Sequence, residues 1–225
     1  MYQGILTESI IKRAIENKHV EINIHNIRDF STDPHKNVDD YAFGGGKGMV
    51  LMIEPIYNAI NHFKQKDSLV VMMTPQGKTY NQSLAYDLSK VKHLIILCGH
   101  YEGFDERIRT LVDLEISVGD YILTGGEIPS MILIDSIVRL LDGVIANESH
   151  INDSFNNNLL DYPVYTKPVD FMGMKVPEVL LSGHHKNIEN WRKEQALKKT
   201  EERRPDLLEK RWYYEKTLYD SQRNI

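Results

Sequence analysis

Hydrophobic positions follow helical and strand spacings in turn along this chain. Residues 2–16 place apolar side chains at every third or fourth position, which predicts an amphipathic helix, and the alternation at residues 20–24 predicts a strand. Further on, short apolar runs predict strands at 69–73, 94–97 and 114–118, with 121–123 as an extension, and helical spacing predicts helices at 81–91, 104–111 and 127–140. This succession predicts an α/β fold built on a mostly parallel sheet.

Polar stretches separate these elements and indicate where domains end. Residues 30–48 are polar and rich in glycine, which predicts a long loop before a helix at 52–65. Residues 141–161 are crowded with asparagine, a composition typical of a linker. From Lys186 onward the spacing is helical, with a break at Pro205. We therefore expect a domain at 1–145, a flexible linker at 146–161 and a small helical domain at 162–225.

Composition excludes several classes of protein. Hydrophobic residues make up 41% of the 225 positions, enough for a buried core. The longest apolar runs, such as residues 94–98, are far too short to cross a bilayer. The first residues lack the layout of a signal peptide, and the single cysteine, Cys98, excludes an internal disulfide. A cytoplasmic protein without a membrane anchor is the expectation.

The charge is distributed unevenly. The net charge of −5 argues against a protein that binds nucleic acid without specificity. Residues 162–225, however, hold 13 Lys/Arg and 10 Asp/Glu, a balance of +3, which leaves −8 for the first 161 residues. Both tryptophans, Trp191 and Trp212, lie in this basic part. An RNA-binding surface is one interpretation, and an ordinary solvated helical face is the other.

Three loops that contain glycine follow the three apolar strands, at residues 74–77, 98–103 and 117–126. Because the carboxyl ends of parallel strands meet at one edge of a sheet, these loops are expected to lie together where ligands bind. Glycine allows the backbone to approach a ligand closely. Three tight turns that need glycine for geometry alone remain the alternative.

Other common motifs are missing. No Gly-x-Gly-x-x-Gly links a strand to a helix, and Lys47 in the run Gly44-Gly45-Gly46-Lys47-Gly48 is followed by glycine, so this run is not a phosphate loop. The histidines show no metal-ligand spacing, and we predict no metal site. On spacing alone, Asp153 in the polar linker and Arg139 at a helix end would be a solvated charge and a partner of the helix dipole.

Ordered motifs nonetheless resemble those of the bacterial tRNA (guanine-N1)-methyltransferases, a family of knotted, SPOUT-class methyltransferases. The resemblance is collinear over nearly the whole chain. It is carried by residues 38–40 and 43–49, Thr74-Pro75-Gln76-Gly77, residues 98–107, residues 117–127, residues 133–136 with Arg139, Asp153-Ser154-Phe155, residues 159–163 with Tyr165-Thr166, and residues 180–185 with Trp191-Arg192. Family members also begin with a short strand that precedes the residues matching Met1-Tyr2, and this sequence does not contain it.

The resemblance implies a deep trefoil knot, against the usual rule of unthreaded chains. It also implies a homodimer with active sites at the subunit interface. The three glycine loops would hold S-adenosyl-L-methionine. The candidate cofactor residues are Thr74, Pro75, Gln76, Gly77, Gly99, Tyr101, Glu102, Gly103, Val118, Gly119, Asp120, Tyr121, Ile122, Leu123, Gly125 and Gly126. The candidate tRNA contacts, from the resemblance and the basic segment, are Asp39, Gly44, Gly45, Gly46, Lys47, Ser182, His184, Trp191, Arg192, Lys198 and Lys199.

The implied reaction is methylation of N1 of the guanine immediately 3′ of the anticodon, position 37 of tRNA. Asp153 matches the family's general base and Arg139 its arginine at the guanine, where it would stabilise charge on O6. The family is also reported to depend on Mg²⁺. Two other interpretations remain: a knotted methyltransferase that acts on another RNA site, and a non-catalytic RNA-binding protein.

Overall fold

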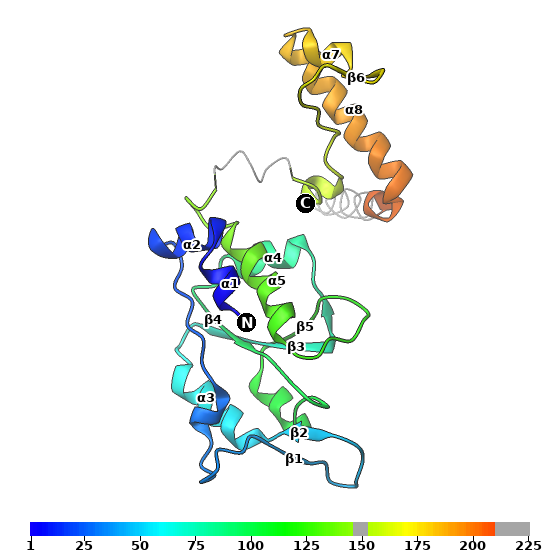
Figure 1. Ribbon diagram of the computed structural model, residues 1–225. Coiled ribbons are helices and arrows are strands. Elements are labelled where there is room, and N and C mark those ends of the chain that lie inside the picture. The colour runs from blue at the N-terminus through cyan, green and yellow to red at the C-terminus, as the bar shows by residue number, and fades with distance from the viewer. Residues whose placement is uncertain (146–152, 210–225) are drawn as a thin grey trace, which may run out of the picture. The chain divides into compact units, whose positions relative to one another are not determined.

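The computed structural model describes residues 1–145 and 153–209, and the chain divides into two compact units, Met1–Ala146 and Asn147–Ile225. The first unit holds a central parallel sheet with helices on both faces (Figure 1). The second holds a long helix, a short helix and a two-stranded hairpin. Within the described ranges no helix is both long and apolar enough to span a bilayer.

Three parallel strands form the sheet, in the order β4-β3-β5, which confirms the predicted parallel arrangement. They are β3 (Ser68–Thr79), β4 (His93–Leu97) and β5 (Leu114–Ser117). Helix α4 (Gln82–Leu88) connects β3 to β4, and its first turn is capped by Asn81, whose side chain accepts a hydrogen bond from the Leu84 N–H. The 3-10 helix η2 (Glu106–Leu111) connects β4 to β5.

The central strand, β3, contains a bulge that the sequence did not predict. Both Met73 and Lys78 are paired with Ile116 of β5, so residues 74–77 bulge out of the ladder inside β3. The first glycine loop is therefore part of a strand, and not a turn that follows one. The suggested extension of the third strand over 121–123 is also wrong, because those residues are irregular.

Alternate side chains of β3 enter two different cores. Val70 and Met72 pack with α3 (Ile53–Phe63) and η2, whereas Val71 and Met73 pack with α4 and α5 (Glu127–Val138). All four side chains are buried. Helices on both faces therefore explain why the sequence of this strand is continuously apolar.

The N-terminal segment differs from its prediction. The expected helix at 2–16 is two helices, α1 (Gln3–Leu6) and α2 (Ser9–Glu16), because the backbone is extended at Glu8. The strand expected at 20–24 is wrong: Val20 and Ile22 pack on the cluster between α2 and α5 without pairing with another strand. The 3-10 helix η1 (Ile27–Phe30) follows.

The predicted loop at 30–48 contains half of a β-hairpin. Strand β1 (Asp39–Tyr41) pairs antiparallel with β2 (Met49–Leu51). The turn uses the left-handed backbone at residues 44–46 and at Gly48, where φ lies between +81° and +135°, a conformation that glycine adopts without strain. Val38 and Leu51 anchor the base of the hairpin in the core beside α3.

The second unit is organised around helix α8 (His185–Arg203), which ends just before Pro205 as predicted. Its other elements are η3 (Asn156–Asn158), β6 (Asp170–Phe171), β7 (Met174–Lys175) and α7 (Glu178–Leu181). Strands β6 and β7 form an antiparallel hairpin.

Part of the predicted linker is fixed to α8. Residues 146–152 lie outside the described residues. The Leu160 N–H donates to Thr200 Oγ1 (2.9 Å), and Lys199 Nζ donates to the Asp161 carbonyl (3.0 Å). Thr200 is fully buried and donates in turn to the Ala196 carbonyl (2.6 Å). The end of the predicted linker, at Leu160 and Asp161, is therefore held against α8 by hydrogen bonds that include the buried Thr200.

Candidate active site

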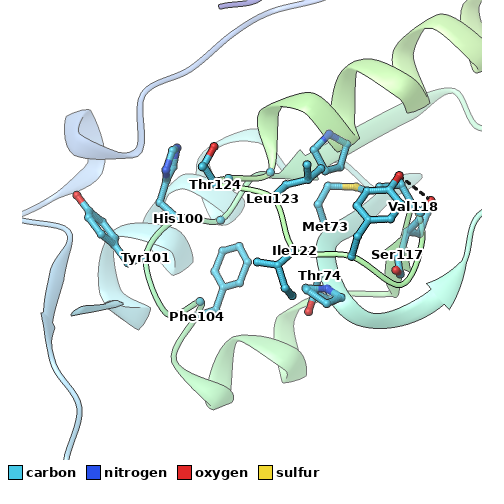
Figure 2. Close-up of a pocket in the computed structure, with 18 of the residues that line it drawn as sticks. Met73, Thr74, His100, Tyr101, Phe104, Ser117, Val118, Ile122, Leu123 and Thr124 are labelled. Carbon is cyan, nitrogen blue, oxygen red and sulfur yellow. Dashed lines mark hydrogen bonds between the residues drawn. The ribbon is translucent and has the colours of Figure 1, made fainter. Parts of the chain in front are cut away.

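A cavity of about 280 Å³ lies among the loops at the carboxyl edge of the sheet (Figure 2). It is built by residues 73–75 of β3, residues 99–104 after β4, residues 116–117 at the end of β5, residues 118–119 and 121–126 after β5, and Pro129 of α5. Phe104 and Ile122 lie near the middle of the view in Figure 2, and Tyr101 lies at its edge. The cavity thus combines apolar side chains with the backbone of partly buried and buried glycines.

The three loops come together as the sequence predicted. All but three of the candidate cofactor residues line the cavity. Those three are Gln76, Gly77 and Asp120. Gly77 faces the neighbouring strand instead, since a Cβ there would lie 2.4 Å from the Ile116 backbone nitrogen. Gln76 accepts a hydrogen bond from Arg109, which also contacts Glu115 of β5.

Sequence reasoning missed several residues that line the cavity: Met73, His100, Phe104, Ile116, Ser117, Thr124 and Pro129. His100 Nε2 lies 2.6 Å from Oε1 of Glu127, a contact between the loop after β4 and the start of α5. The two residues are far apart in the sequence, so spacing gave no signal for the pair. Met73, Ile116 and Pro129 are strand and helix residues whose pattern predicts burial and not ligand contact.

Glycines allow the pocket loops to approach one another. The Gly126 N–H donates to the Gly99 carbonyl (2.8 Å), and a Cβ on Gly126 would lie 2.6 Å from the Cys98 Cα. Gly119 has φ +151°, and the Tyr121 ring covers it so closely that a Cβ would lie 2.5 Å from the ring. A side chain at either glycine would therefore change the shape of the cavity.

The loop after β4 ends at a charged cap. Arg107 donates through Nε (2.9 Å) and Nη2 (2.7 Å) to the Asp105 carboxylate, which also accepts from the Arg107 N–H. These hydrogen bonds hold the pKa of Asp105 below its usual range. The exposed pair fixes the start of η2 more than it stabilises the fold.

The β1–β2 hairpin is attached directly to this loop. The Glu102 N–H donates to the Met49 carbonyl (3.0 Å), and the Leu51 N–H donates to the Gly103 carbonyl (2.9 Å). The Glu102 side chain also lies against Gly48, where a Cβ would be 2.5 Å from its carboxylate. The candidate tRNA loop and the cavity therefore share a continuous backbone framework.

Candidate tRNA residues of the hairpin are accessible around its turn. Asp39 in β1 forms an ion pair with Arg28 (3.7 Å). Residues 44–47 and the aromatic side chain of Phe43 are exposed at the turn. An exposed aromatic ring beside flexible glycines is a surface on which a nucleobase can stack.

The two candidate catalytic residues lie in different units. Arg139 is the C-cap of α5, and its N–H donates to the Asp135 carbonyl (3.3 Å). Asp153 is partly buried and precedes Ser154, whose Oγ accepts from the Asp161 N–H (2.9 Å). Arg139 therefore lies at the end of a helix of the first unit, and Asp153 lies in the irregular segment that opens the described part of the second.

Comparison with known proteins decides the family. A sequence model described as tRNA (Guanine-1)-methyltransferase TrmD matches residues 1–210. The chain belongs to the tRNA (guanine-1)-methyltransferase family. Among its relatives, the tRNA (guanine-N(1)-)-methyltransferase of Mycoplasma mycoides subsp. mycoides is 58% identical over 205 residues, 91% of this chain and 85% of the relative. Those of Halalkalibacterium halodurans (55%, 94% of this chain and 88% of the relative) and Dictyoglomus turgidum (51%, 93% and 86%) are similar over comparable lengths.

The family match extends into the second unit, where the remaining candidate tRNA residues lie. Ser182 is the C-cap of α7 and its Oγ accepts from the N–H of His184, the N-cap of α8 (3.2 Å). Arg192 stacks over the Tyr162 ring at 4.8 Å, and the ring of Trp191 lies 6.4 Å from that of Tyr165. In this family member, a cationic side chain and an aromatic side chain in the first half of α8 therefore lie beside aromatic rings of the segment before β6.

Two lysines further along α8 differ in their surroundings. Lys198 is exposed, whereas Lys199 is partly buried through its bond to the Asp161 carbonyl. In the described part of this tRNA (guanine-1)-methyltransferase family member, no group of three or more His, Cys, Asp or Glu side chains is arranged to hold a metal ion.

Proposed function

We propose that this protein is an enzyme that methylates N1 of a guanine in tRNA. The family match over residues 1–210 carries the proposal, because it covers the cavity, Arg139, Asp153 and the start of α8 together. The relatives named tRNA (guanine-N(1)-)-methyltransferase are more than half identical over most of the chain, which supports the same reaction here.

The proposed methyl donor is S-adenosyl-L-methionine, and the residues of the cavity suit it. Backbone at Gly99 and Gly125 can meet the edge of an adenine by hydrogen bonding, and Phe104 and Ile122 offer apolar surface to its ring. The Glu102 carboxylate lines the same cavity and can pair with an amino group. When bound, this donor supplies a methyl group that is already activated by its sulfonium.

The proposed target is the guanine at position 37, immediately 3′ of the anticodon. Guanine N1 carries a proton and becomes nucleophilic only when that proton leaves. Asp153 is proposed to accept the proton, and Arg139 to stabilise the negative charge that develops on O6. The exposed turn at residues 44–47 and the basic face of α8 are proposed to hold the anticodon arm.

A homodimer with a trefoil-knotted domain is proposed to assemble this site. Exposed apolar side chains at Ile128 and Ile132, four residues apart on α5, form a surface that a second copy of the chain would cover. Asp153 and Arg139 belong to different units, which is consistent with a site completed by two subunits. Symmetric pairing would create two such sites per dimer.

Product analysis tests the reaction. Wild-type protein, S-adenosylmethionine and tRNA are incubated, and the methylated nucleotide is located by mass mapping of a tRNA digest. N1-methylguanine at position 37 is expected. Methylation elsewhere would identify a knotted methyltransferase with another target, and donor binding without any product would favour an RNA-binding protein.

Mixing two inactive variants tests the shared site. Gly119→Val should abolish donor binding, because φ is +151° at this position, which a side chain rarely adopts, and because the new side chain would displace the Tyr121 ring. Asp153→Ala should abolish turnover and leave donor binding intact. After subunit exchange, mixed dimers contain one site with neither defect, and activity should return to roughly a quarter of wild type. No recovery after verified exchange would place Asp153 in the site of its own subunit, or outside catalysis.

A further inference from the structure

Tyr2 connects the N-terminal segment to two of the pocket loops. Its hydroxyl lies 2.5 Å from Ser130 Oγ and 3.2 Å from Cys98 Sγ. Cys98 immediately precedes Gly99, and Ser130 lies in the first turn of α5, where its N–H donates to the Gly126 carbonyl (3.0 Å). Figure 1 shows α1 beside α5. Tyr2 does not line the cavity. It contacts Cys98 and Ser130, which adjoin the two cavity loops that contain Gly99 and Gly126.

Proton counting gives these contacts a direction. Ser130 Oγ donates its only proton to the Glu127 carbonyl (2.7 Å), so it accepts from the Tyr2 hydroxyl. The Tyr2 oxygen is then left to accept from the Cys98 thiol. Burial raises the pKa of the Tyr2 hydroxyl and of the Cys98 thiol, so both keep their protons at neutral pH. The result is a fully satisfied chain from Cys98 through Tyr2 and Ser130 to Glu127.

A second contact joins the same two loops at the cavity itself. The Gly126 N–H donates to the Gly99 carbonyl (2.8 Å), and the two backbones touch without room for a Cβ. The Gly99 and Gly126 loops are thus joined in two places. One is the backbone hydrogen bond at the cavity, and the other is the pair of Tyr2 hydroxyl contacts with Cys98 and Ser130. Ser130 is 1% exposed, so solvent does not replace the Tyr2 hydroxyl easily.

We propose that Tyr2 is a positioning residue for methyl transfer, whose hydroxyl holds the Gly99 loop and the Gly126 loop at the separation that the methyl donor needs. The proposal rests on the proposed function, since it concerns the affinity for S-adenosylmethionine. Tyr2 acts through Cys98 and Ser130 and makes no contact with the substrate.

The chain offers a matched control for a purely structural role. The Tyr80 hydroxyl lies 2.7 Å from Ser136 Oγ, further along α5. Tyr80 is partly buried, as Tyr2 is, and Ser136 Oγ also donates to backbone carbonyls of its own helix. Neither Tyr80 nor Ser136 lines the cavity. Tyr80→Phe therefore removes the same kind of hydrogen bond from the same helix, and it leaves the bond from the Tyr80 N–H to the Ser117 carbonyl (2.8 Å) in place.

The experiment compares Tyr2→Phe with Tyr80→Phe. Both variants should lose a few degrees of melting temperature, because each leaves a serine oxygen without its tyrosine donor. Only Tyr2→Phe should bind S-adenosylmethionine more weakly, by about fivefold in calorimetry, the equivalent of one net hydrogen bond. Ser130→Ala should weaken binding similarly, and Tyr2→Phe combined with Ser130→Ala should be no worse than either change alone.

The single cysteine provides a second measurement. Cys98 is the only thiol in the chain, so its reaction with a disulfide reagent reports on this contact alone. The reaction should be faster in Tyr2→Phe than in wild type, and unchanged in Tyr80→Phe, because only the first variant frees the thiol and loosens the loops.

The outcomes separate the two proposals. Equal affinity of wild type and Tyr2→Phe for S-adenosylmethionine, with a lowered melting temperature, would make Tyr2 a structural residue only and overturn its positioning role. A wild-type protein that does not bind S-adenosylmethionine would overturn the proposed donor, and the role of Tyr2 with it. If Tyr2→Phe and Tyr80→Phe both bind S-adenosylmethionine more weakly, the cause is a general loss of stability. That result would also overturn the positioning role.

Discussion

Replacing Gly126 with alanine tests whether the pocket depends on close backbone contact. The backbone at Gly126 is right-handed (φ −81°, ψ −4°), so alanine fits its dihedral angles and only space is in question. The new Cβ would lie 2.6 Å from the Cys98 Cα and 2.8 Å from the Gly99 nitrogen. Both are backbone atoms and cannot rotate away, so the two loops must separate.

The expected cost has two parts. Overpacking costs about 1–3 kcal/mol, and losing the bond from the Gly126 N–H to the Gly99 carbonyl costs about 1 kcal/mol. The free energy of unfolding should therefore fall by about 2–4 kcal/mol, measured by urea denaturation. Misplaced pocket walls also weaken donor binding. A loss of about 1.4 kcal/mol in the free energy of binding raises the Kd for S-adenosylmethionine tenfold, which calorimetry measures.

The neighbouring residue supplies the control. A Cβ on Gly125 would meet the ends of the Glu127 and His100 side chains, at 2.5 Å and 2.8 Å, and both can rotate away if they give up their own contact of 2.6 Å. Because that contact is partly exposed, Gly125→Ala should lower the free energy of unfolding by about 1 kcal/mol or less. If Gly126→Ala and Gly125→Ala lower the free energy of unfolding by the same amount, the close contact between the Gly99 and Gly126 backbones does not constrain the pocket loops.

Thr200→Val should lower the free energy of unfolding by about 1–3 kcal/mol in urea and expose residues 153–161 to protease, because it removes the acceptor of the Leu160 N–H; unchanged proteolysis would contradict this. Burial raises the pKa of Cys98 in the folded protein, so stability should be complete below the unfolded pKa of about 8.5 and fall as the pH rises above it. Melting temperatures between pH 7 and 10 should then decline less in Cys98→Ala; equal slopes would refute the linkage. Lys198→Ala should reduce the salt slope of tRNA binding by about one in filter assays, and Lys199→Ala should also lower the melting temperature through its lost bond to Asp161. An unaltered salt slope for Lys198→Ala would make this side of α8 ordinary solvated surface.

The spacing of hydrophobic residues predicted those helices and strands in which burial alone determines the sequence pattern. The run at 69–73 gave a buried central strand because both of its faces are covered. The same reasoning failed at 20–24, where Val20 and Ile22 are partly buried against helices but have no strand beside them. Alternating apolar positions indicate which side chains face a core. They do not indicate whether the backbone forms hydrogen bonds with a neighbouring strand.

Contacts between distant residues were beyond the reach of the sequence. The hairpin at Asp39–Tyr41 and Met49–Leu51 has a polar strand and a glycine turn, and it is stabilised by its attachment to Gly103. The pocket could be predicted as three glycine loops at one edge, because parallel topology alone brings them together. Its side-chain pairs, such as His100 with Glu127, depend on packing details that no local pattern encodes.

The attachment of the hairpin also bears on the order in which the chain folds. Strand β2 is complete at Leu51, yet the backbone groups that fasten it belong to residues 102–105. During synthesis from the N-terminus, the glycine turn must wait for about fifty further residues before it is fixed. Such non-local closure is slow compared with helix formation. The turn proposed to meet the target base is therefore expected to become ordered only after residues 102–105 have left the ribosome.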